Sequence, residues 1–263
     1  MITFLKLGGS LITDKTRPYT PRLKMLDNLA AQIAKVMQEN PEIQLILGHG
    51  SGSFGHEAAS KFSTRLGVSG PEKWKGFAEV WYQASTLNRL VVESLRKVNL
   101  PAVTLAPFPA VTAHDCKIIA WDLAPLKASI SNRLLPIIHG DVVFDQVRGG
   151  TILSTEDLFS YLAHYLQPNR ILLAGLEQGV WKDFPNRTCL LKEITPKTFA
   201  KQTPGLGRSA GADVTGGMQT KVTEMLKLVE EIPGLDILIF SGEEPVNVLR
   251  AFDGENPGTR LHS

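Results

Sequence analysis

After Met1 the chain begins with ITFLKLGGS (residues 2–10), a short apolar run that ends at two adjacent glycines. Such a run, apolar on both faces and closed by glycine, is typical of a strand buried between helices. Five later runs have the same character: Ile43–Leu47, Ala102–Leu105, Leu135–Ile138, Ile171–Ala174 and Leu235–Phe240. Together with Ile2–Leu7 they make six predicted strands.

Apolar residues at helical spacing lie between these runs, in three segments that extend over residues 26–36, 77–95 and 222–229. Alternating strands and helices predict an α/β fold, a three-layer αβα sandwich with an open, mainly parallel central sheet. No internal repeat or low-complexity linker divides the chain, so we expect a single domain over residues 1–263. The Pro/Gly-rich stretch Thr203–Gly217 is expected to be a long loop.

The composition excludes several classes of protein. The 263 residues include 28 basic and 26 acidic side chains, and a net charge of +2 attracts neither nucleic acid nor an anionic membrane. No apolar run approaches the roughly 20 residues that span a bilayer, and Lys6 interrupts the opening run too early for a signal peptide. Cys116 and Cys189 lie far apart without metal spacing, so a cytoplasmic location is expected.

Glycines mark the first two candidate sites. In the first, Gly8, Gly9 and Ser10 follow Lys6 at the end of a strand, and backbone amides beside a lysine can hold an anion. The second is GHGSGSFGH (residues 48–56), which matches the dinucleotide-binding pattern G-x-G-x-x-G literally. That pattern keeps a dinucleotide-dependent oxidoreductase open, but a histidine after the third glycine is foreign to it. His56 there favours a phosphate contact near a helix N-terminus.

Two further sites combine carboxylates, hydroxyls and a lysine. His139-Gly140-Asp141 ends a predicted strand, where side chains face the ligand crevice of a parallel sheet, and Ser154-Thr155-Glu156-Asp157 follows. Asp141 as a turn former, and Ser154 or Thr155 as a helix cap, remain open alternatives. Asp213–Lys221 offers glycine amides, a hydroxyl and a lysine on the first turn of a helix. Lysines and amides in this number favour phosphoryl transfer, which depends on positioning and charge neutralisation.

The order of these motifs resembles the amino acid kinase superfamily. K-x-G-G-S (residues 6–10), the glycine loop, H-G-D, D-V-T-G-G-M-x-x-K and a closing G-x-x-x-G-T (residues 254–259) follow one another along essentially the whole chain. Within the superfamily, His56 after Gly-Ser-Phe-Gly, and Lys15 in SLITDK, resemble the isopentenyl phosphate kinases. Fosfomycin kinases share this histidine, so a phosphonate kinase is the nearest alternative.

The resemblance implies a homodimeric enzyme that uses ATP and Mg²⁺ to phosphorylate isopentenyl phosphate, with no metal-ligating side chain of its own. It implies an acceptor-binding lobe over residues 1–160 and a nucleotide-binding lobe over residues 161–263. The residues that it implies for ATP are Lys6, Gly8, Gly9, Ser10, Gly52, Gly217 and Lys221. Those implied for the acceptor phosphate are His56, Ser51, Gly55 and Thr155.

The resemblance also implies catalytic roles for Lys6, Lys15, His56 and Lys221, with Lys15 stabilising the group in transfer. Asp141 and Glu156 would orient the lysines. The chain departs from the family in two places: S-G-D-D is here STED (residues 154–157), and T-D-x-D-G-V-Y is here GLEQGVW (residues 175–181).

The acceptor's hydrocarbon tail needs an apolar wall. Phe77, Val80, Trp81 and Ala84 follow the His56 loop at helical spacing and could supply it. Aromatic residues at this spacing more often belong to an ordinary core.

Overall fold

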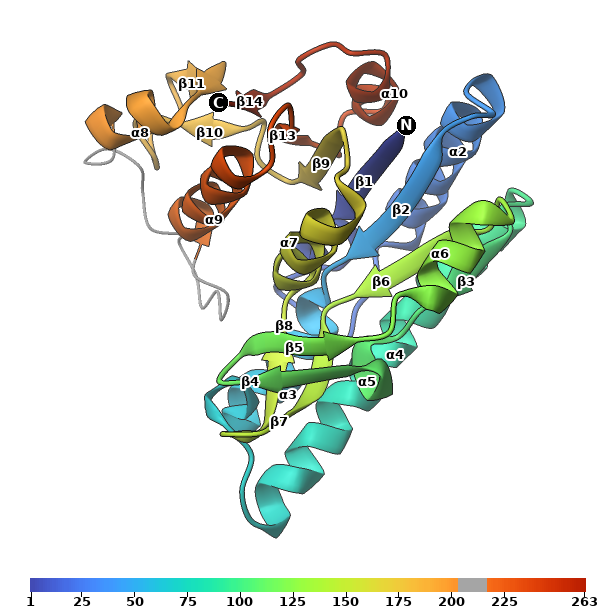
Figure 1. Cartoon of the computed structure of the whole chain (residues 1–263), viewed down its shortest axis with the longest axis vertical. Helices are drawn as coiled ribbons and strands as arrows, with labels where there is room; N and C mark the ends of the chain where they lie inside the picture. The colour runs from blue at the N-terminus through green and yellow to red at the C-terminus, as the bar shows by residue number, and fades with distance from the viewer. Residues whose placement is uncertain (203–216) are drawn as a thin grey trace.

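The computed structural model describes residues 1–202 and 217–263 and has an eight-stranded sheet at its centre (Figure 1). The strand order is β12-β14-β13-β9-β1-β2-β6-β3, and every neighbouring pair is parallel except β13 and β14. The strands are β1 (Ile2–Leu7), β2 (Gln44–His49), β3 (Ala102–Thr104), β6 (Leu135–His139), β9 (Arg170–Gly175), β12 (Glu193–Ile194), β13 (Asp236–Ser241) and β14 (Thr259–Leu261). All six predicted strands are confirmed to within two residues at either end.

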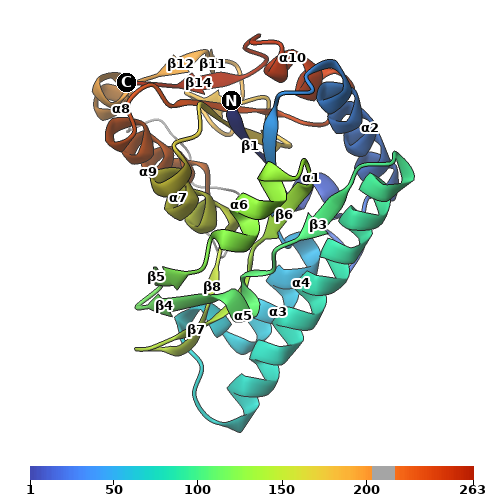
Figure 2. The same ribbon diagram turned by 45° about the vertical axis from the view of Figure 1, so that its right-hand side comes forward.

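Helices cover both faces of this sheet (Figure 2). One face packs against α2 (Leu23–Glu39), α4 (Pro71–Lys97) and α10 (Asn247–Phe252), and the other against α6 (Ala124–Ser131), α7 (Thr155–Leu166) and α9 (Gly217–Glu231). Successive strand residues serve opposite layers: Leu5 packs with the α2 and α4 side chains, whereas Phe4 lies on Phe159 of α7 with ring centroids 4.9 Å apart. The three predicted helical segments and the three-layer sandwich are confirmed.

A second sheet was not predicted. It contains β4 (Val111–His114), β5 (Lys117–Trp121), β7 (Asp141–Asp145) and β8 (Gly149–Leu153) in the order β5-β4-β7-β8. Figure 1 shows it below the main sheet, beside the lower part of α4 and α3 (Gly52–Phe62). Its small core joins Ala58, Val68, Phe77 and Val142. Most of β5 is exposed or half-buried, so its sequence carries no buried-strand pattern.

The remaining elements are short. They are α1 (Gly9–Ile12), the 3₁₀ turn η1 (Thr64–Leu66), α5 (Pro107–Ala110), α8 (Pro196–Gln202) and a hairpin of β10 (Val180–Trp181) with β11 (Leu190–Leu191). The predicted loop Thr203–Gly217 lies outside the described residues, except for Gly217, which begins α9.

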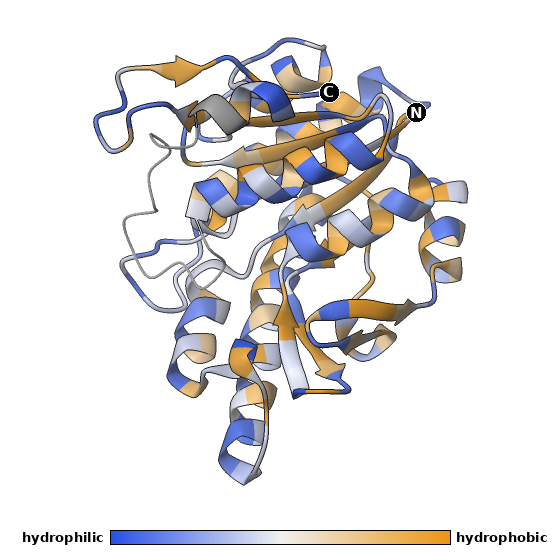
Figure 3. Cartoon of the chain, turned by 60° about the vertical axis from the view of Figure 1, so that its left-hand side comes forward, coloured by the Kyte–Doolittle hydropathy of each residue, from blue (hydrophilic) through white to orange (hydrophobic). Residues whose placement is uncertain are grey.

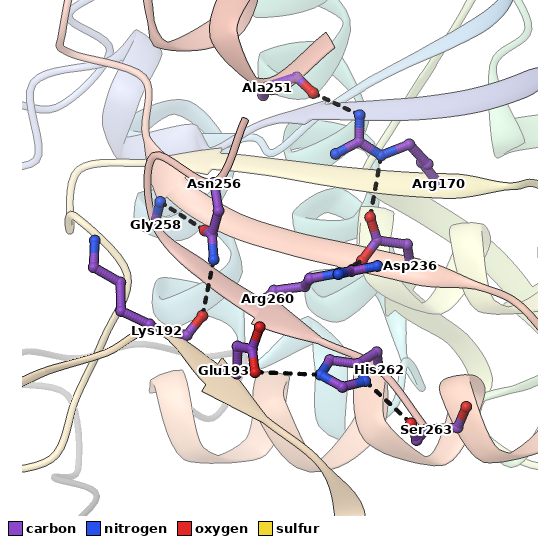
Figure 4. A network of polar contacts seen from close by, with 10 residues as sticks. All are labelled: Arg170, Lys192, Glu193, Asp236, Ala251, Asn256, Gly258, Arg260, His262 and Ser263. Atoms are coloured by element: carbon purple, nitrogen blue, oxygen red, sulfur yellow. Dashed lines mark hydrogen bonds and ion pairs between the residues drawn. The ribbon is translucent and has the colours of Figure 1, made fainter. Parts of the chain in front are cut away.

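A polar network ties the C-terminal strand to the amino-terminal edge of the sheet (Figure 4). Asp236 of β13 accepts hydrogen bonds from Arg170 of β9 at 3.2 Å and from Arg260 of β14 at 2.6 Å. Arg170 also donates to the Ala251 carbonyl of α10 at 2.6 Å. One carboxylate therefore joins three neighbouring strands, and one of its arginines joins them to a helix.

Figure 3 shows apolar residues along the strands, and helices that carry both apolar and polar stretches. Over residues 1–202 and 217–263, no helix combines the length and the hydropathy that a membrane crossing requires.

Candidate functional site

Two glycine loops meet at the carboxyl edge of the sheet. β1 and β2 are adjacent and parallel, so the loops that follow them begin side by side, and the amide of Gly50 donates to the carbonyl of Leu7. A Cβ on Gly9 would overlap the backbone of Gly52, which itself has a φ of +48°. Only glycine permits both the contact and that conformation. The Thr13 hydroxyl locks the pair, because it donates to the Gly9 carbonyl at 2.8 Å and accepts from the Ser53 amide at 2.9 Å.

These loops border a cavity of about 300 Å³. All but one of the residues that the family resemblance implied for ATP, for the acceptor phosphate, for catalysis or for lysine orientation line it. They are Lys6, Gly8, Gly9, Ser10, Lys15, Ser51, Gly52, Gly55, His56, Thr155, Glu156, Gly217 and Lys221. The four glycine-bearing segments, spread over more than 200 residues of sequence, thus converge on one cavity.

A carboxylate lies between two lysines in this cavity. Glu156 Oε1 is 3.0 Å from Lys6 Nζ and 3.4 Å from Lys221 Nζ. Burial raises the pKa of Glu156, but the positive charges of Lys6 and Lys221 outweigh burial and lower that pKa to about 2. Glu156 is therefore ionised at neutral pH. It joins a lysine of β1 to a lysine of α9 across the cavity.

Asp141 is the expected site residue that the structure places elsewhere. It is fully buried at the start of β7, its Oδ1 accepts from the Val142 amide at 2.8 Å, and its Oδ2 lies 3.5 Å from His139 Nε2. It is absent from the cavity wall. Asp141 begins a strand of the second sheet, and its side chain is buried there. The structure therefore does not bring it within ion-pair distance of the lysines.

The hydroxyls of Ser51 and Thr155 connect the segments of the site through hydrogen bonds to backbone carbonyls. Ser51 Oγ donates to the Gly140 carbonyl at 2.8 Å, and Thr155 Oγ1 donates to the His49 carbonyl at 2.6 Å. Since each hydroxyl hydrogen is already used, these hydroxyls have no hydrogen left to donate to an anion. His56 lies five residues into α3 from its cap residue, Ser51, facing the same cavity.

A buried histidine pair beneath the loops was not predicted. The rings of His49 and His139, at the ends of adjacent strands β2 and β6, stack 5.3 Å apart, and His49 Nε2 is 3.1 Å from Asn88 Oδ1. Burial lowers the pKa of His49 to about 3, and the neighbouring His139 acts in the same direction. His49 is therefore neutral in the physiological range and serves as a packed, hydrogen-bonded support for the loop at Gly50.

One end of the cavity carries an ordered cluster on the β10–β11 hairpin. Glu177 accepts from Trp181 Nε1 at 2.9 Å and from Arg187 Nη2 at 2.7 Å, and the Arg187 guanidinium lies 5.1 Å from the Phe184 ring. Burial raises the pKa of Glu177, but the hydrogen bonds from Arg187 and Trp181 outweigh it and lower that pKa. The departure of residues 175–181 from the family pattern marked Glu177 and Trp181 in the sequence. No sequence signal marked Phe184 or Arg187.

The predicted apolar wall is only partly present. Val80 lines the cavity together with Ala59 and Ile152. Phe77 is buried against the rings of Trp74, Phe108 and Phe144 instead, and Ala84 is fully buried in α4. Trp81 is half-exposed beside Phe108. The core interpretation therefore holds for most of this helix face, and Val80 alone reaches the cavity.

Two expectations concern parts of the site that the structure does not fully describe. Asp213–Gly216 of the fourth motif lies outside the described residues, whereas Gly217 and Lys221 of the same motif line the cavity. Over residues 1–202 and 217–263, no group of three or more His, Cys, Asp or Glu side chains has the arrangement of a metal site. The described cavity offers lysines, amides, hydroxyls and two carboxylates: Glu156 is engaged by Lys6 and Lys221, and Glu177 by Arg187.

Comparisons with known proteins agree with this geometry. The profile of the amino acid kinase family matches residues 1–241. Isopentenyl phosphate kinase from Methanocaldococcus jannaschii is 34% identical over 99% of this chain and 98% of its own. The enzyme of that name from Methanothermobacter thermautotrophicus is 30% identical over 98% of this chain and 97% of its own. A solved X-ray structure of isopentenyl phosphate kinase has a TM-score of 0.81 at 25% identity, covering 99% of this chain and all of that one.

Proposed function

The chain belongs to the amino acid kinase family, and on that premise we propose that it phosphorylates isopentenyl phosphate to isopentenyl diphosphate with ATP. The observation that carries the proposal is the cavity in which Lys6, Lys221 and Glu156 face the two glycine loops and His56. The matching family and the named relatives are kinases, which favours phosphoryl transfer over a dinucleotide-dependent oxidoreductase.

The two ends of the cavity receive the two substrates. The phosphates of ATP bind to the amides of Gly9 and Ser10, with Gly8 and Gly52 nearby and with Gly217 and Lys221 at the start of α9. The amide of Gly8 itself donates to the Ala174 carbonyl at 2.8 Å. The nucleoside extends toward the cluster around Glu177 and Trp181. The acceptor phosphate binds at the N-terminal turn of α3, held by His56 and by the amide of Ser51, with Gly55 and Thr155 beside it. The amide of Gly55 itself donates to the Ser51 carbonyl at 3.1 Å.

Catalysis in this site rests on charge neutralisation. An oxygen of the acceptor phosphate attacks the γ-phosphorus of ATP, a new P–O bond forms to the acceptor, and the bond to the β-phosphate oxygen breaks to release ADP. Because the attacking oxygen is already anionic, no strong general base is required. Lys6, Lys15 and Lys221 offset the repulsion between the two anions, and Glu156 fixes the position of two of these lysines.

The phosphates of the nucleotide would hold Mg²⁺, which would neutralise part of their charge. From the family resemblance we further propose a homodimer, a cytoplasmic location, and a division into an acceptor lobe (residues 1–160) and a nucleotide lobe (residues 161–263). Ala59, Val80 and Ile152 form the apolar surface beside the acceptor site that suits a short hydrocarbon tail.

A coupled assay for ADP release tests the proposal. Purified protein with Mg²⁺ and ATP is given isopentenyl phosphate, fosfomycin or no acceptor. We expect rapid ADP release only with isopentenyl phosphate. Turnover with fosfomycin alone would identify a phosphonate kinase and overturn the proposed acceptor.

His56→Ala provides the matched test of the acceptor site. We expect it to raise the KM for isopentenyl phosphate or to remove turnover, while the KM for ATP stays within about twofold, since His56 is proposed to bind the acceptor phosphate and not ATP. His114→Ala, an exposed histidine on β4, is the control. Wild-type kinetics for His56→Ala would exclude His56 from the acceptor site.

A further inference from the structure

Arg65 is a cation in the cavity that has no role in the phosphoryl transfer proposed for Lys6, Lys15 and Lys221. Arg65 lies in the 3₁₀ turn η1 and lines the cavity beside Ser154 and Thr155. Its backbone carbonyl accepts a hydrogen bond from the Thr151 hydroxyl of β8 at 3.2 Å. The turn is thus fixed to the strand that leads into α7, and the guanidinium is presented to the first turn of that helix.

The guanidinium of Arg65 is incompletely bonded. Its Nη2 is 3.9 Å from Asp157 Oδ2, which is beyond hydrogen-bond range. That oxygen already accepts from the Ser154 amide at 2.7 Å and from the Ser154 hydroxyl at 2.8 Å, in the capping box of α7. Nη1 is buried and, in the part of the chain that the structure describes, has no hydrogen-bond partner. A buried, unpaired donor on a charged group is costly unless a ligand completes it.

The position of Arg65 is also unfavourable without an anion. The N-terminus of a helix is its positive pole, where cations are destabilising and anions bind. Arg65 lies at that pole of α7. The positive charge of Arg65 also reaches α9, the helix that carries Lys221. Burial and the negative charges of Asp157 and Glu156 raise the pKa of Glu224 on that helix, and the charge of Arg65 lowers it. The guanidinium therefore lies near the point where the acceptor side of the cavity meets the helix of Lys221.

We propose that Arg65 binds the phosphate of the acceptor, leaving its loose contact with Asp157 when the acceptor is present. The planar guanidinium donates two parallel hydrogen bonds to two oxygens of a phosphate monoester, which a lysine cannot do. This inference rests on the proposed function, because it names a further contact to the same acceptor. It makes Arg65 a determinant of the preference for a phosphorylated acceptor over an uncharged one.

The test compares Arg65→Gln and Arg65→Lys with Arg148→Gln. Arg148 is a matched control because its side chain is as exposed as that of Arg65 (32% and 31%), and it pairs with Asp115 outside the cavity. For Arg65→Gln we expect the KM for isopentenyl phosphate to rise about tenfold or more and the KM for ATP to stay within about twofold. Arg65→Lys is expected to recover part of the loss, and Arg148→Gln to leave both KM values unchanged.

Two results would overturn the inference. One is an unchanged KM for isopentenyl phosphate in Arg65→Gln. The other is an equal loss toward both substrates together with a lower Tm, which would mean that Arg65 only supports α7. If the wild-type protein does not phosphorylate isopentenyl phosphate at all, the proposed function fails, and calorimetric binding of inorganic phosphate then tests Arg65 separately. Equal affinity of the wild-type protein and Arg65→Gln for inorganic phosphate would overturn the inference in that case.

Discussion

Two carboxylates in this molecule each lie between two cationic side chains, at opposite edges of the same sheet. At the carboxyl edge, a single oxygen of Glu156 faces both Lys6 at 3.0 Å and Lys221 at 3.4 Å. At the amino edge, Asp236 uses separate oxygens, one for Arg170 and one for Arg260 (Figure 4). The charges are alike, but the geometry differs.

That difference separates a binding site from a structural tie. Arginine forks that hydrogen-bond to separate carboxylate oxygens and to a main-chain carbonyl make a rigid, directional network. Lysines are compact point charges on flexible stems, and two of them on one oxygen are held close together in a cavity open to ligands. The glycine loops lie beside the lysine pair, so we assign phosphate chemistry to the Glu156 edge and stability to the Asp236 edge.

The largest expected effect is that of Lys221→Ala. Removal of a cation that neutralises the phosphoryl group in transfer is expected to lower kcat by about 100- to 1,000-fold. Arg260→Ala, the equivalent truncation in the Asp236 network, is expected to leave kcat within about twofold. The coupled ADP-release assay measures both. A Lys221→Ala enzyme with wild-type kcat would break the assignment of the Glu156 edge to catalysis.

Glu156→Gln is expected to have the second-largest effect. Without its negative charge Lys6 and Lys221 repel each other, and we expect kcat/KM to fall by about 10- to 100-fold. Glu156→Asp retains the charge on a shorter stem and is the conservative control, expected to lose less. Circular dichroism should show an intact fold in both variants. Equal losses in the two would mean that side-chain length, rather than charge, positions the lysines.

Much of the carboxyl edge of the sheet could be predicted from sequence because its signals are local. A strand such as Ile2–Leu7 is apolar on both faces, and each glycine loop directly follows its strand. Carboxyl ends of parallel strands share one edge, so glycine loops that directly follow their strands are expected at that edge, where Gly9 and Gly50 are in contact. Glu156 was predicted from its place in a motif, and it lies between the lysines as expected.

Residues that depend on strand register or on tertiary packing could not be predicted. The stacking of His49 on His139 follows from the pairing of β2 with β6, which no local pattern encodes. Asp236 meets its arginines only because β13 lies between β9 and β14. The buried position of Asp141 could not be predicted for the same reason. A strand of the main sheet, β6, ends at His139, and a strand of the second sheet, β7, begins at Asp141, whose side chain is buried.

Asp236→Asn is expected to affect stability rather than activity. The change removes the charge from a partly buried network and weakens hydrogen bonds to two arginines, for a loss of about 1–3 kcal/mol in the free energy of unfolding. The KM values and kcat should stay within about twofold of wild type. Urea unfolding followed by fluorescence measures the loss. A fall in kcat without a change in stability would contradict the structural role of this edge.

The smallest expected effect is that of pH on Glu156 in the working range. Its folded pKa of about 2 lies below the ordinary value of 4.5, so its ionised form stabilises the fold above about pH 4.5, and that stabilisation is lost as pH falls toward 2. Between pH 5 and 9 its charge is constant, and we expect the stability curves of the wild-type protein and Glu156→Gln to run parallel. Below pH 4.5 the two curves should converge. A wild-type kcat/KM profile with an acidic limb at pH 5–7 that disappears in Glu156→Gln would show that the lysines do not hold Glu156 ionised.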